Sequence, residues 1–162
     1  MTAGTPLAAA RDDPRMPTLL VVHHTPSPNL QAVLEAVREG AALVDDVDVC
    51  LRPALSAGAA DLLAADGVLL GTPANIGYMS GALKHFFDTV YYPCLDATVG
   101  LPYGVYVHGN DDTAGALTSI QTITGALRWK QVAAPLSLIG SPGSDDLEAC
   151  RELAATVAVG LV

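Results

Sequence analysis

The chain has 162 residues, of which 51% are hydrophobic and 5% aromatic, and its formal net charge at pH 7 is −9. A chain of this length and composition can bury one aliphatic core, which excludes disorder along its whole length. The acidic balance, with Lys84 and Lys130 as the only lysines, argues against nucleic acid or an anionic membrane surface as a partner, because both attract basic patches.

The three cysteines are Cys50, Cys94 and Cys150, and no two of them are close in the sequence. This pattern disfavours a disulfide framework and a zinc site, and it favours a reducing, cytoplasmic location. No stretch reaches the roughly 18 apolar residues of a membrane span. Residues 1–16, MTAGTPLAAARDDPRM, are predicted to be a disordered leader before a single domain over 17–162, and Met16 is an alternative start.

Apolar periodicity predicts five strands that alternate with five helices. The strands are expected at 18–23, 47–51, 67–71, 101–108 and 130–140, and the helices at 29–39, 56–66, 80–92, 112–129 and 144–159. Ser80, Asp112 and Ser144 are predicted N-caps, and Gly40 is predicted to mark the end of the first helix. Pro135 cannot donate to a sheet ladder, so it predicts an edge position or a bulge for the last strand.

Strict alternation of strands and helices predicts an α/β fold with a doubly wound parallel sheet, because crossovers between parallel strands are right-handed. Ligands bind such sheets beyond the carboxyl ends of the strands. Three segments should therefore meet at one edge, namely HTPSPN at 24–29, TPANIGYM at 72–79 and HGNDD at 108–112.

The first of these segments favours an anion. Ser27 is a natural N-cap and Pro28 falls at the first helical position, where a missing N–H costs little. The N–H groups of Asn29 and Leu30 would point out of the helix start, and the hydroxyls of Thr25 and Ser27 could donate to phosphate oxygens. An ordinary capped helix without a ligand has the same local sequence.

The second segment continues into GTPANIGYMSGALKHFFD, residues 71–88. This stretch resembles the flavodoxin-like family, in particular its NAD(P)H-dependent flavin and quinone reductase branch, and the likeness extends over about residues 18–160. The resemblance implies a five-stranded parallel sheet of order 2-1-3-4-5 with helices on both faces. Pro28 and Leu30 stand where that family usually has Gly and Thr, which puts the affinity for phosphate in question more than its position.

The resemblance also implies non-covalent FMN, without a metal or a required catalytic side chain. The phosphate would contact the first loop, and the flavin ring would lie between the second and third loops. The implied cofactor-binding residues are Thr25, Ser27, Pro28, Asn29, Leu30, Pro73, Ala74, Asn75, Ile76, Gly77, Tyr78, His108, Gly109 and Asn110. Ordinary packing roles remain alternatives for Tyr78 and His108.

The function implied is an oxidoreductase that takes electrons from NADPH or NADH and passes them through flavin to a quinone, a flavin or a similar small-molecule acceptor. The alternative is a non-enzymatic electron carrier, which the acidic surface suits, or a related protein with weakened flavin binding. A homodimer or homotetramer is compatible with the family. No nucleic-acid or membrane partner is expected.

Other nucleotide-binding and hydrolytic folds lack their signatures here. A receiver domain needs acidic residues after its first and third strands, where this chain has HHTPS and GTPAN. The chain also lacks the GxxxxGK[ST] of P-loop proteins, the GxGxxG of dinucleotide-binding folds and the GxSxG of a nucleophile elbow.

Overall fold

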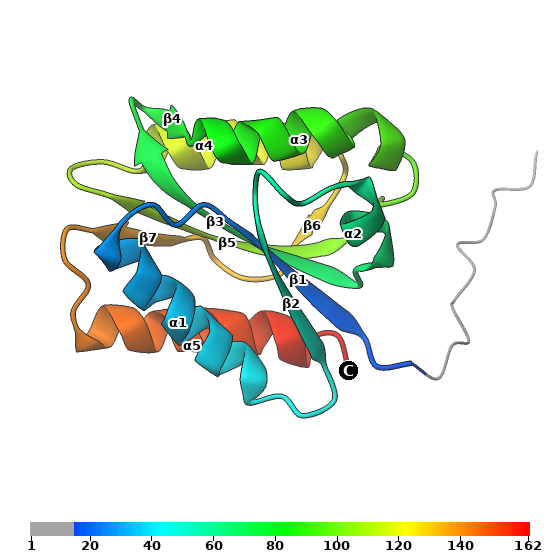
Figure 1. Ribbon diagram of the computed structural model, residues 1–162, viewed down its shortest axis with the longest axis horizontal. Coiled ribbons are helices and arrows are strands. Elements are labelled where there is room, and N and C mark those ends of the chain that lie inside the picture. The colour runs from blue at the N-terminus through cyan, green and yellow to red at the C-terminus, as the bar shows by residue number, and fades with distance from the viewer. Residues whose placement is uncertain (1–14) are drawn as a thin grey trace, which may run out of the picture.

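The computed structural model describes residues 15–162, so the leader predicted at 1–16 lies almost wholly outside the described residues. Twelve elements follow in order (Figure 1). They are β1 (Thr18–His23), α1 (Pro28–Ala42), β2 (Asp48–Pro53), α2 (Ala59–Ala64), β3 (Gly67–Asn75), β4 (Tyr78–Met79), α3 (Gly81–Cys94), β5 (Pro102–Gly109), α4 (Ala114–Ala126), β6 (Lys130–Gln131), β7 (Leu136–Ile139) and α5 (Ser144–Val159).

The parallel strands lie in the order β2-β1-β3-β5, and both β6 and β7 pair with β5 at the far edge. The predicted order 2-1-3-4-5 is therefore confirmed, with the fifth strand in two pieces. Residues between the pieces include Pro135, which explains the interruption because proline has no N–H for the ladder. The register places His23 beside Gly71 and Pro73 beside His108, and β3 and β5 continue past the level at which β1 ends, so the loops after all three strands leave the same edge of the sheet.

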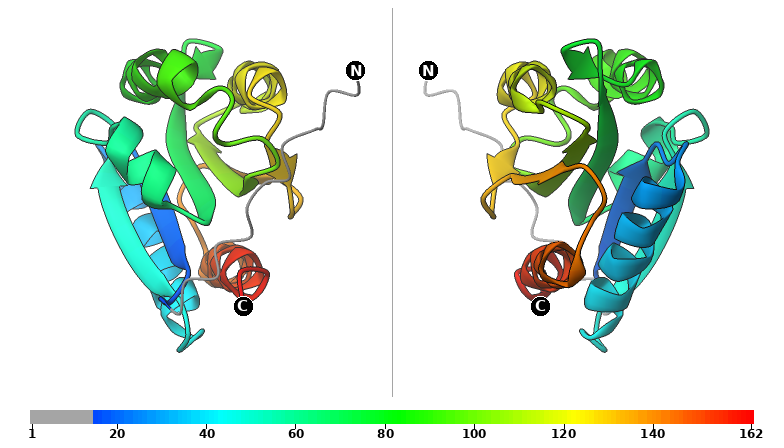
Figure 2. Two further views of the ribbon diagram at one scale, coloured as in Figure 1. Left: turned by 90° about the vertical axis from the view of Figure 1, so that its right-hand side faces the viewer. Right: turned by 90° about the vertical axis from the view of Figure 1, so that its left-hand side faces the viewer.

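Helices cover both faces of the sheet (Figure 2). Helices α1 and α5 lie together on one face, and their core contains Leu30, Val33, Tyr106 and Leu153. Helices α3 and α4 lie on the other face with α2, over a core that includes Phe86, Phe87 and Trp129. The short strand β4 was not predicted. It pairs antiparallel with the end of β3 in a two-residue hairpin.

Three boundary predictions are wrong. Gly40 does not end the first helix, because α1 continues to Ala42 and Gly40 is buried within it. The N-cap of α4 is Thr113 rather than Asp112, although the Asp112 carboxylate accepts a hydrogen bond from the Ala114 N–H at 2.9 Å. The N-cap of α5 is Gly143 rather than Ser144. In contrast, Ser80 caps α3 as predicted and accepts from the Leu83 N–H at 3.2 Å.

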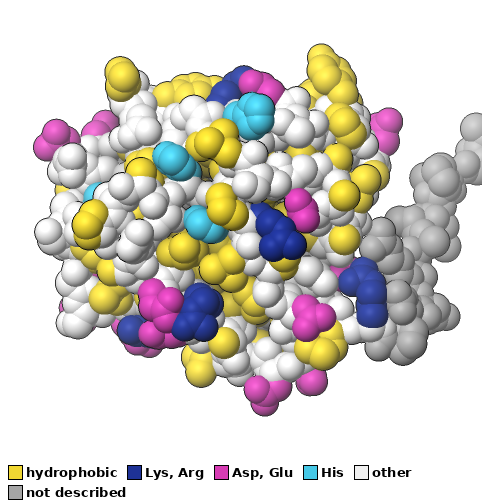
Figure 3. All heavy atoms as spheres, in the orientation of Figure 1, with side chains coloured by type: hydrophobic (Ala, Val, Ile, Leu, Met, Phe, Trp, Pro, Cys, Tyr) yellow, Lys and Arg dark blue, Asp and Glu magenta, His cyan; other side chains and the backbone are white. Residues whose placement is uncertain are grey.

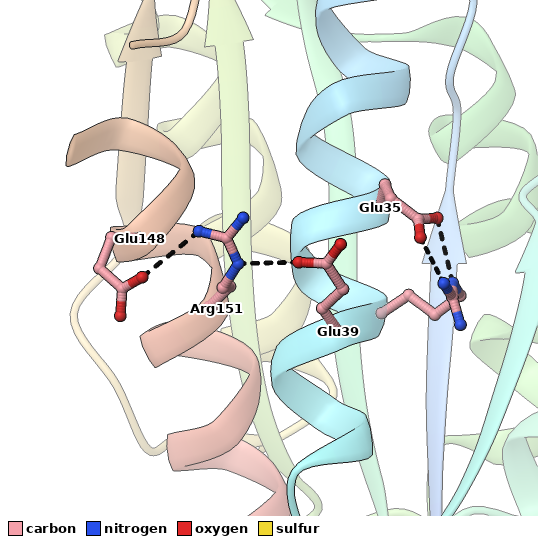
Figure 4. A network of polar contacts seen from close by, with 5 residues as sticks. Glu35, Glu39, Glu148 and Arg151 are labelled. Atoms are coloured by element: carbon pink, nitrogen blue, oxygen red, sulfur yellow. Dashed lines mark hydrogen bonds and ion pairs between the residues drawn. The ribbon is translucent and has the colours of Figure 1, made fainter. Parts of the chain in front are cut away.

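Close packing joins α1 to α5. A Cβ atom on Gly40 would overlap the backbone of Arg151, so glycine lets the two helices approach each other. Arg151 also donates to Glu39 at 2.8 Å and to Glu148 at 3.3 Å (Figure 4). These side chains are exposed, and exposed ion pairs contribute little to stability. The backbone contact at Gly40 is therefore the stronger constraint on the pair.

None of the helices within residues 15–162 combines the length and apolar character needed to cross a membrane.

The replacement Gly40→Ala should destabilise the protein by about 1–3 kcal/mol, because the added methyl group overpacks the α1–α5 contact. Chemical denaturation measures this loss. The matched control is Gly125→Ala, at a helical glycine that has nothing within 4 Å of an added Cβ. That change should stabilise by about 0.5–1 kcal/mol through helix propensity. Equal stabilisation by both changes would contradict the packing role of Gly40.

Candidate functional site

One pocket collects all three predicted loops at the carboxyl edge of the sheet, on the left of Figure 1. Its volume is about 230 Å³. The lining residues are Pro26, Ser27, Asn29 and Leu30 from the β1–α1 loop, Pro73, Ala74 and Asn75 from β3, and His108, Gly109 and Asn110 from the end of β5. The pocket exists because three neighbouring parallel strands end at the same edge of the sheet and each then turns away.

The start of α1 forms the first wall. Ser27 caps the helix with Pro28 at its first position, as predicted. The Leu30 N–H donates to Ser27 Oγ at 3.2 Å, and the Gln31 N–H donates to the Ser27 carbonyl at 3.0 Å. The Asn29 N–H has no acceptor among the described residues. The sequence predicted that the N–H groups of both Asn29 and Leu30 would be free to bind an anion, but only that of Asn29 is. The hydroxyl proton of Ser27 is a second free donor.

Leu30 and Thr25 contribute less to this wall than their positions indicate. The Leu30 side chain is 1% exposed and packs in the core beneath α1, so it is a core residue that meets the pocket only at its margin. Thr25 Oγ1 is hydrogen-bonded to His23 Nδ1 at 2.7 Å and lies in a neighbouring hollow beside Gln31 and Arg38. Burial, and secondarily the charge of His24, lowers the pKa of His23.

The end of β3 forms the second wall and turns back through Ile76 and Gly77. Their φ angles are +50° and +70°, the signature of a type I′ turn, whose two central residues both need positive φ. Glycine adopts this conformation readily, but a β-branched residue does so only with strain. Ile76 is also fully exposed, at 105% of its reference area. The positive φ of Ile76 therefore costs free energy, and burial of its side chain does not offset that cost.

Helix α4 holds this hairpin in place. A Cβ atom on Gly115 would overlap the carbonyl oxygen of Gly77, so the turn rests directly on the helix. The Met79 N–H donates to Ser119 Oγ at 3.2 Å. Gly77 and Tyr78 therefore face a separate groove between the hairpin and α4, and neither they nor Ile76 line the three-loop pocket.

The end of β5 forms the third wall. His108 is only 6% exposed, and its Nε2–H donates to the carbonyl of Gly140 at 2.7 Å. This bond ties β5 to the turn after β7 and uses one of the two ring nitrogens. Gly109 and Asn110 continue the wall. The exposed Asp111 and Asp112 follow, but neither lines the pocket.

The pocket has no formal charge apart from what His108 could carry. Among residues 15–162, no Lys, Arg, Asp or Glu lines it, and Figure 3 shows Lys and Arg side chains thinly scattered over this face. The positive end of α1 is therefore its main fixed source of potential, which favours an anion there. No cluster of three or more metal-ligating side chains occurs among the described residues.

The comparisons with known proteins support the fold. No protein-family model matches the chain. A flavodoxin from Aquifex aeolicus (strain VF5) is 37% identical over 75 residues, which make up 46% of this chain and 40% of that protein. The match thus spans less than half of that relative's length.

Among solved structures, a flavodoxin from the domain Archaea superimposes with a TM-score of 0.77 at 19% identity, over 89% of this chain and 98% of the other. A flavodoxin, WrbA-like protein from Agrobacterium tumefaciens gives a TM-score of 0.70 at 20% identity, over 90% and 97%. The protein therefore has a flavodoxin-like fold, and the fold predicted from the sequence is confirmed.

Two features near the site were missed by sequence reasoning, namely the β3–β4 hairpin and the hydrogen bond from His108 to the carbonyl of Gly140. Pro26, which belongs to the first predicted loop, also lines the pocket. The hairpin had a local signal, since a polar residue and a glycine (Asn75 and Gly77) flank Ile76 between apolar runs. The Gly140 contact had no local sequence signal, because residues 108 and 140 meet only through the pairing of β5 with β7.

Replacing Ile76 by Asn should raise the free energy of unfolding by about 1 kcal/mol, because asparagine tolerates positive φ and no buried surface is lost. Thermal or urea unfolding measures the gain. Val99→Asn is the control, since Val99 is also exposed, at 51%, but has no positive φ. If both changes have the same effect, the turn at Ile76 is not strained.

Proposed function

We propose that the three-loop pocket binds FMN and that the chain is a flavodoxin-type redox protein. The observation that carries this proposal is the convergence of all three loops on a single pocket with an anion-favouring helix start. The flavodoxin match in sequence and the flavodoxin neighbours in structure support the same assignment.

The described residues fit the phosphate of such a cofactor. The Asn29 N–H is without an acceptor at the positive end of α1. Ser27 Oγ accepts from Leu30 and keeps its own proton to donate. No carboxylate among residues 15–162 lines the pocket to repel an anion. These groups, rather than a Lys or Arg, would hold the phosphate.

The ring of the cofactor would lie between the second and third walls. Pro73, Ala74 and Asn75 would bound it on one side, and His108, Gly109 and Asn110 on the other. Bound FMN supplies one- and two-electron redox chemistry. The chain positions the cofactor and excludes water from it. The sequence-based expectation that Ile76, Gly77 and Tyr78 also contact FMN stays a prediction.

The second candidate function is an NAD(P)H-dependent reductase that delivers electrons to a quinone, a flavin or a similar small molecule in the cytoplasm. Two observations favour it. The segment NIGYMS resembles the reductase branch, and one structural neighbour is a WrbA-like protein. The match to a plain flavodoxin favours the electron carrier equally.

Replacing Asn29 by Asp should weaken FMN binding about tenfold or more, because a carboxylate then faces the cofactor phosphate. Titration of FMN fluorescence against the purified protein measures the affinity. Gln31→Glu is the matched control, because it adds the same charge to the first turn of α1 outside the pocket. Both acids favour the helix dipole, so neither change should unfold α1. If the wild-type chain leaves FMN fluorescence unchanged, the cofactor assignment fails.

Reduction of the FMN-loaded protein separates the two candidate functions. A reductase should bleach its flavin absorbance when NADPH or NADH is added without oxygen, and should turn over when a quinone is supplied. An electron carrier should keep its flavin oxidised with either nucleotide, yet become reduced by dithionite. Free FMN at equal concentration is the control for the non-enzymatic reaction.

A further inference from the structure

Among residues 15–162, His108 is the one titratable side chain that lines the three-loop pocket. It lies near the end of β5 and is only 6% exposed. Histidine is the residue whose charge ordinarily changes within the physiological pH range. A poorly solvated site screens charges weakly, so a buried imidazole responds strongly to any charge that a ligand brings beside it. The protonation of His108 should therefore depend on what the pocket holds.

The hydrogen bond to Gly140 decides which nitrogen of His108 can change. A carbonyl oxygen only accepts, so the contact at 2.7 Å requires a hydrogen on Nε2. Nδ1 has no hydrogen-bond partner within residues 15–162, and a further proton would bind there. Protonation at Nδ1 keeps the bond to Gly140 and strengthens it, because a hydrogen bond from an ionised donor is roughly twice as strong as a neutral one.

The strands and helices around His108 place no charge against its ring. In the sheet, His108 lies beside Pro73 of β3 and Leu138 of β7, neither of which titrates. Tyr106 is two residues earlier on the same face of β5. It is fully buried, and burial raises the pKa of its phenol, so this group stays uncharged.

The acids at the helix starts of this edge are directed elsewhere. Asp112 accepts a hydrogen bond from the Ala114 N–H at 2.9 Å, and Asp146 accepts one from the Gly143 N–H at 2.8 Å. The titratable side chains of the adjoining elements all lie outside the pocket lining, namely His23, His24, Asp111, Asp112, Asp145 and Asp146. A charge that forms inside the pocket therefore has His108 as its titratable counterpart.

We propose that His108 takes up a proton when the bound flavin is reduced, so that electron transfer by this chain is coupled to a proton held by the protein. The inference rests on FMN binding in the three-loop pocket. Reduction by two electrons and one proton leaves a negative charge on the flavin ring (FMN + 2e⁻ + H⁺ → FMNH⁻). No Lys or Arg among the described residues lines the pocket to balance that charge. An imidazolium at His108 balances it, with a proton that moves from solvent to Nδ1 and returns when the electrons leave.

The pH dependence of the midpoint potential tests this coupling. For a two-electron couple, each proton taken up lowers the potential by about 30 mV per pH unit, which is a tenfold change in the equilibrium constant. The FMN-loaded protein is titrated with dithionite, without oxygen, from about pH 5 to about pH 9. The slope should be about 30 mV at both ends of the range. It should be about twice as steep between the pH at which His108 protonates in the oxidised protein and the higher pH at which it protonates in the reduced protein.

His108→Gln should remove the steep interval and leave a slope of about 30 mV per pH unit throughout. Its amide can still donate to the Gly140 carbonyl, but it cannot take up a proton. His85→Gln is the matched control, because His85 is an exposed histidine of α3 outside the pocket. It should keep the steep interval. A steep interval that survives in His108→Gln overturns the inference, because the second proton then binds another group.

Nuclear magnetic resonance of ¹⁵N-labelled histidine rings in the wild-type chain needs no variant that might fold or bind FMN poorly. Within the steep interval, the His108 ring should be neutral in the oxidised FMN-loaded protein and protonated after reduction by dithionite, whereas the His85 ring should not change. A His108 ring with the same protonation in both redox states at every pH overturns this inference and leaves FMN binding intact. A chain that does not bind FMN overturns the inference and the proposed function together.

Discussion

Parallel pairing of β1, β3 and β5 is the constraint on which the site depends. The register sets Gly71 beside His23 and His108 beside Pro73. The loops after the three strands therefore all leave the sheet from the same edge. The helices that follow must turn back over the sheet, so their N-terminal ends gather at this edge as well. The pocket and its anion-favouring wall follow from that register, and the tie from His108 to Gly140 follows from the pairing of β5 with β7.

At the β3–β4 hairpin, local preference and structure disagree. Ile76 occupies a left-handed position that glycine or asparagine would fill without strain, and its side chain gains nothing from burial. The hairpin is nevertheless held firmly, through the Gly77–Gly115 contact and the Met79–Ser119 hydrogen bond. Strain that the surrounding structure maintains is typical of functional positions. The hairpin separates the candidate cofactor pocket from the groove beside α4.

Sequence patterns were most accurate where a signal is local. Ser27 and Ser80 cap their helices as predicted, because a cap depends on a few consecutive residues. The caps predicted at Asp112 and Ser144 each missed by one residue. Sequence patterns failed where the role of a residue depends on a contact with a residue distant in the sequence. Glycine often ends a helix, but Gly40 lies inside α1, where its lack of a side chain allows the close contact with Arg151 on α5. Leu30 stands where a phosphate-binding hydroxyl was considered, but its side chain belongs to the core under α1.

The alternation of apolar strands and amphipathic helices by itself determined the doubly wound sheet and the three loops of the site, because crossover handedness leaves few alternatives. The strand order came from the resemblance to the flavodoxin-like family. Only the tertiary structure decided which residues of the second loop line the pocket and which line the neighbouring groove. It placed Pro73–Asn75 in the pocket and Gly77–Tyr78 in the groove, because the hairpin leans on Gly115 of α4. That division rests on a backbone contact between residues 77 and 115, which no local pattern encodes.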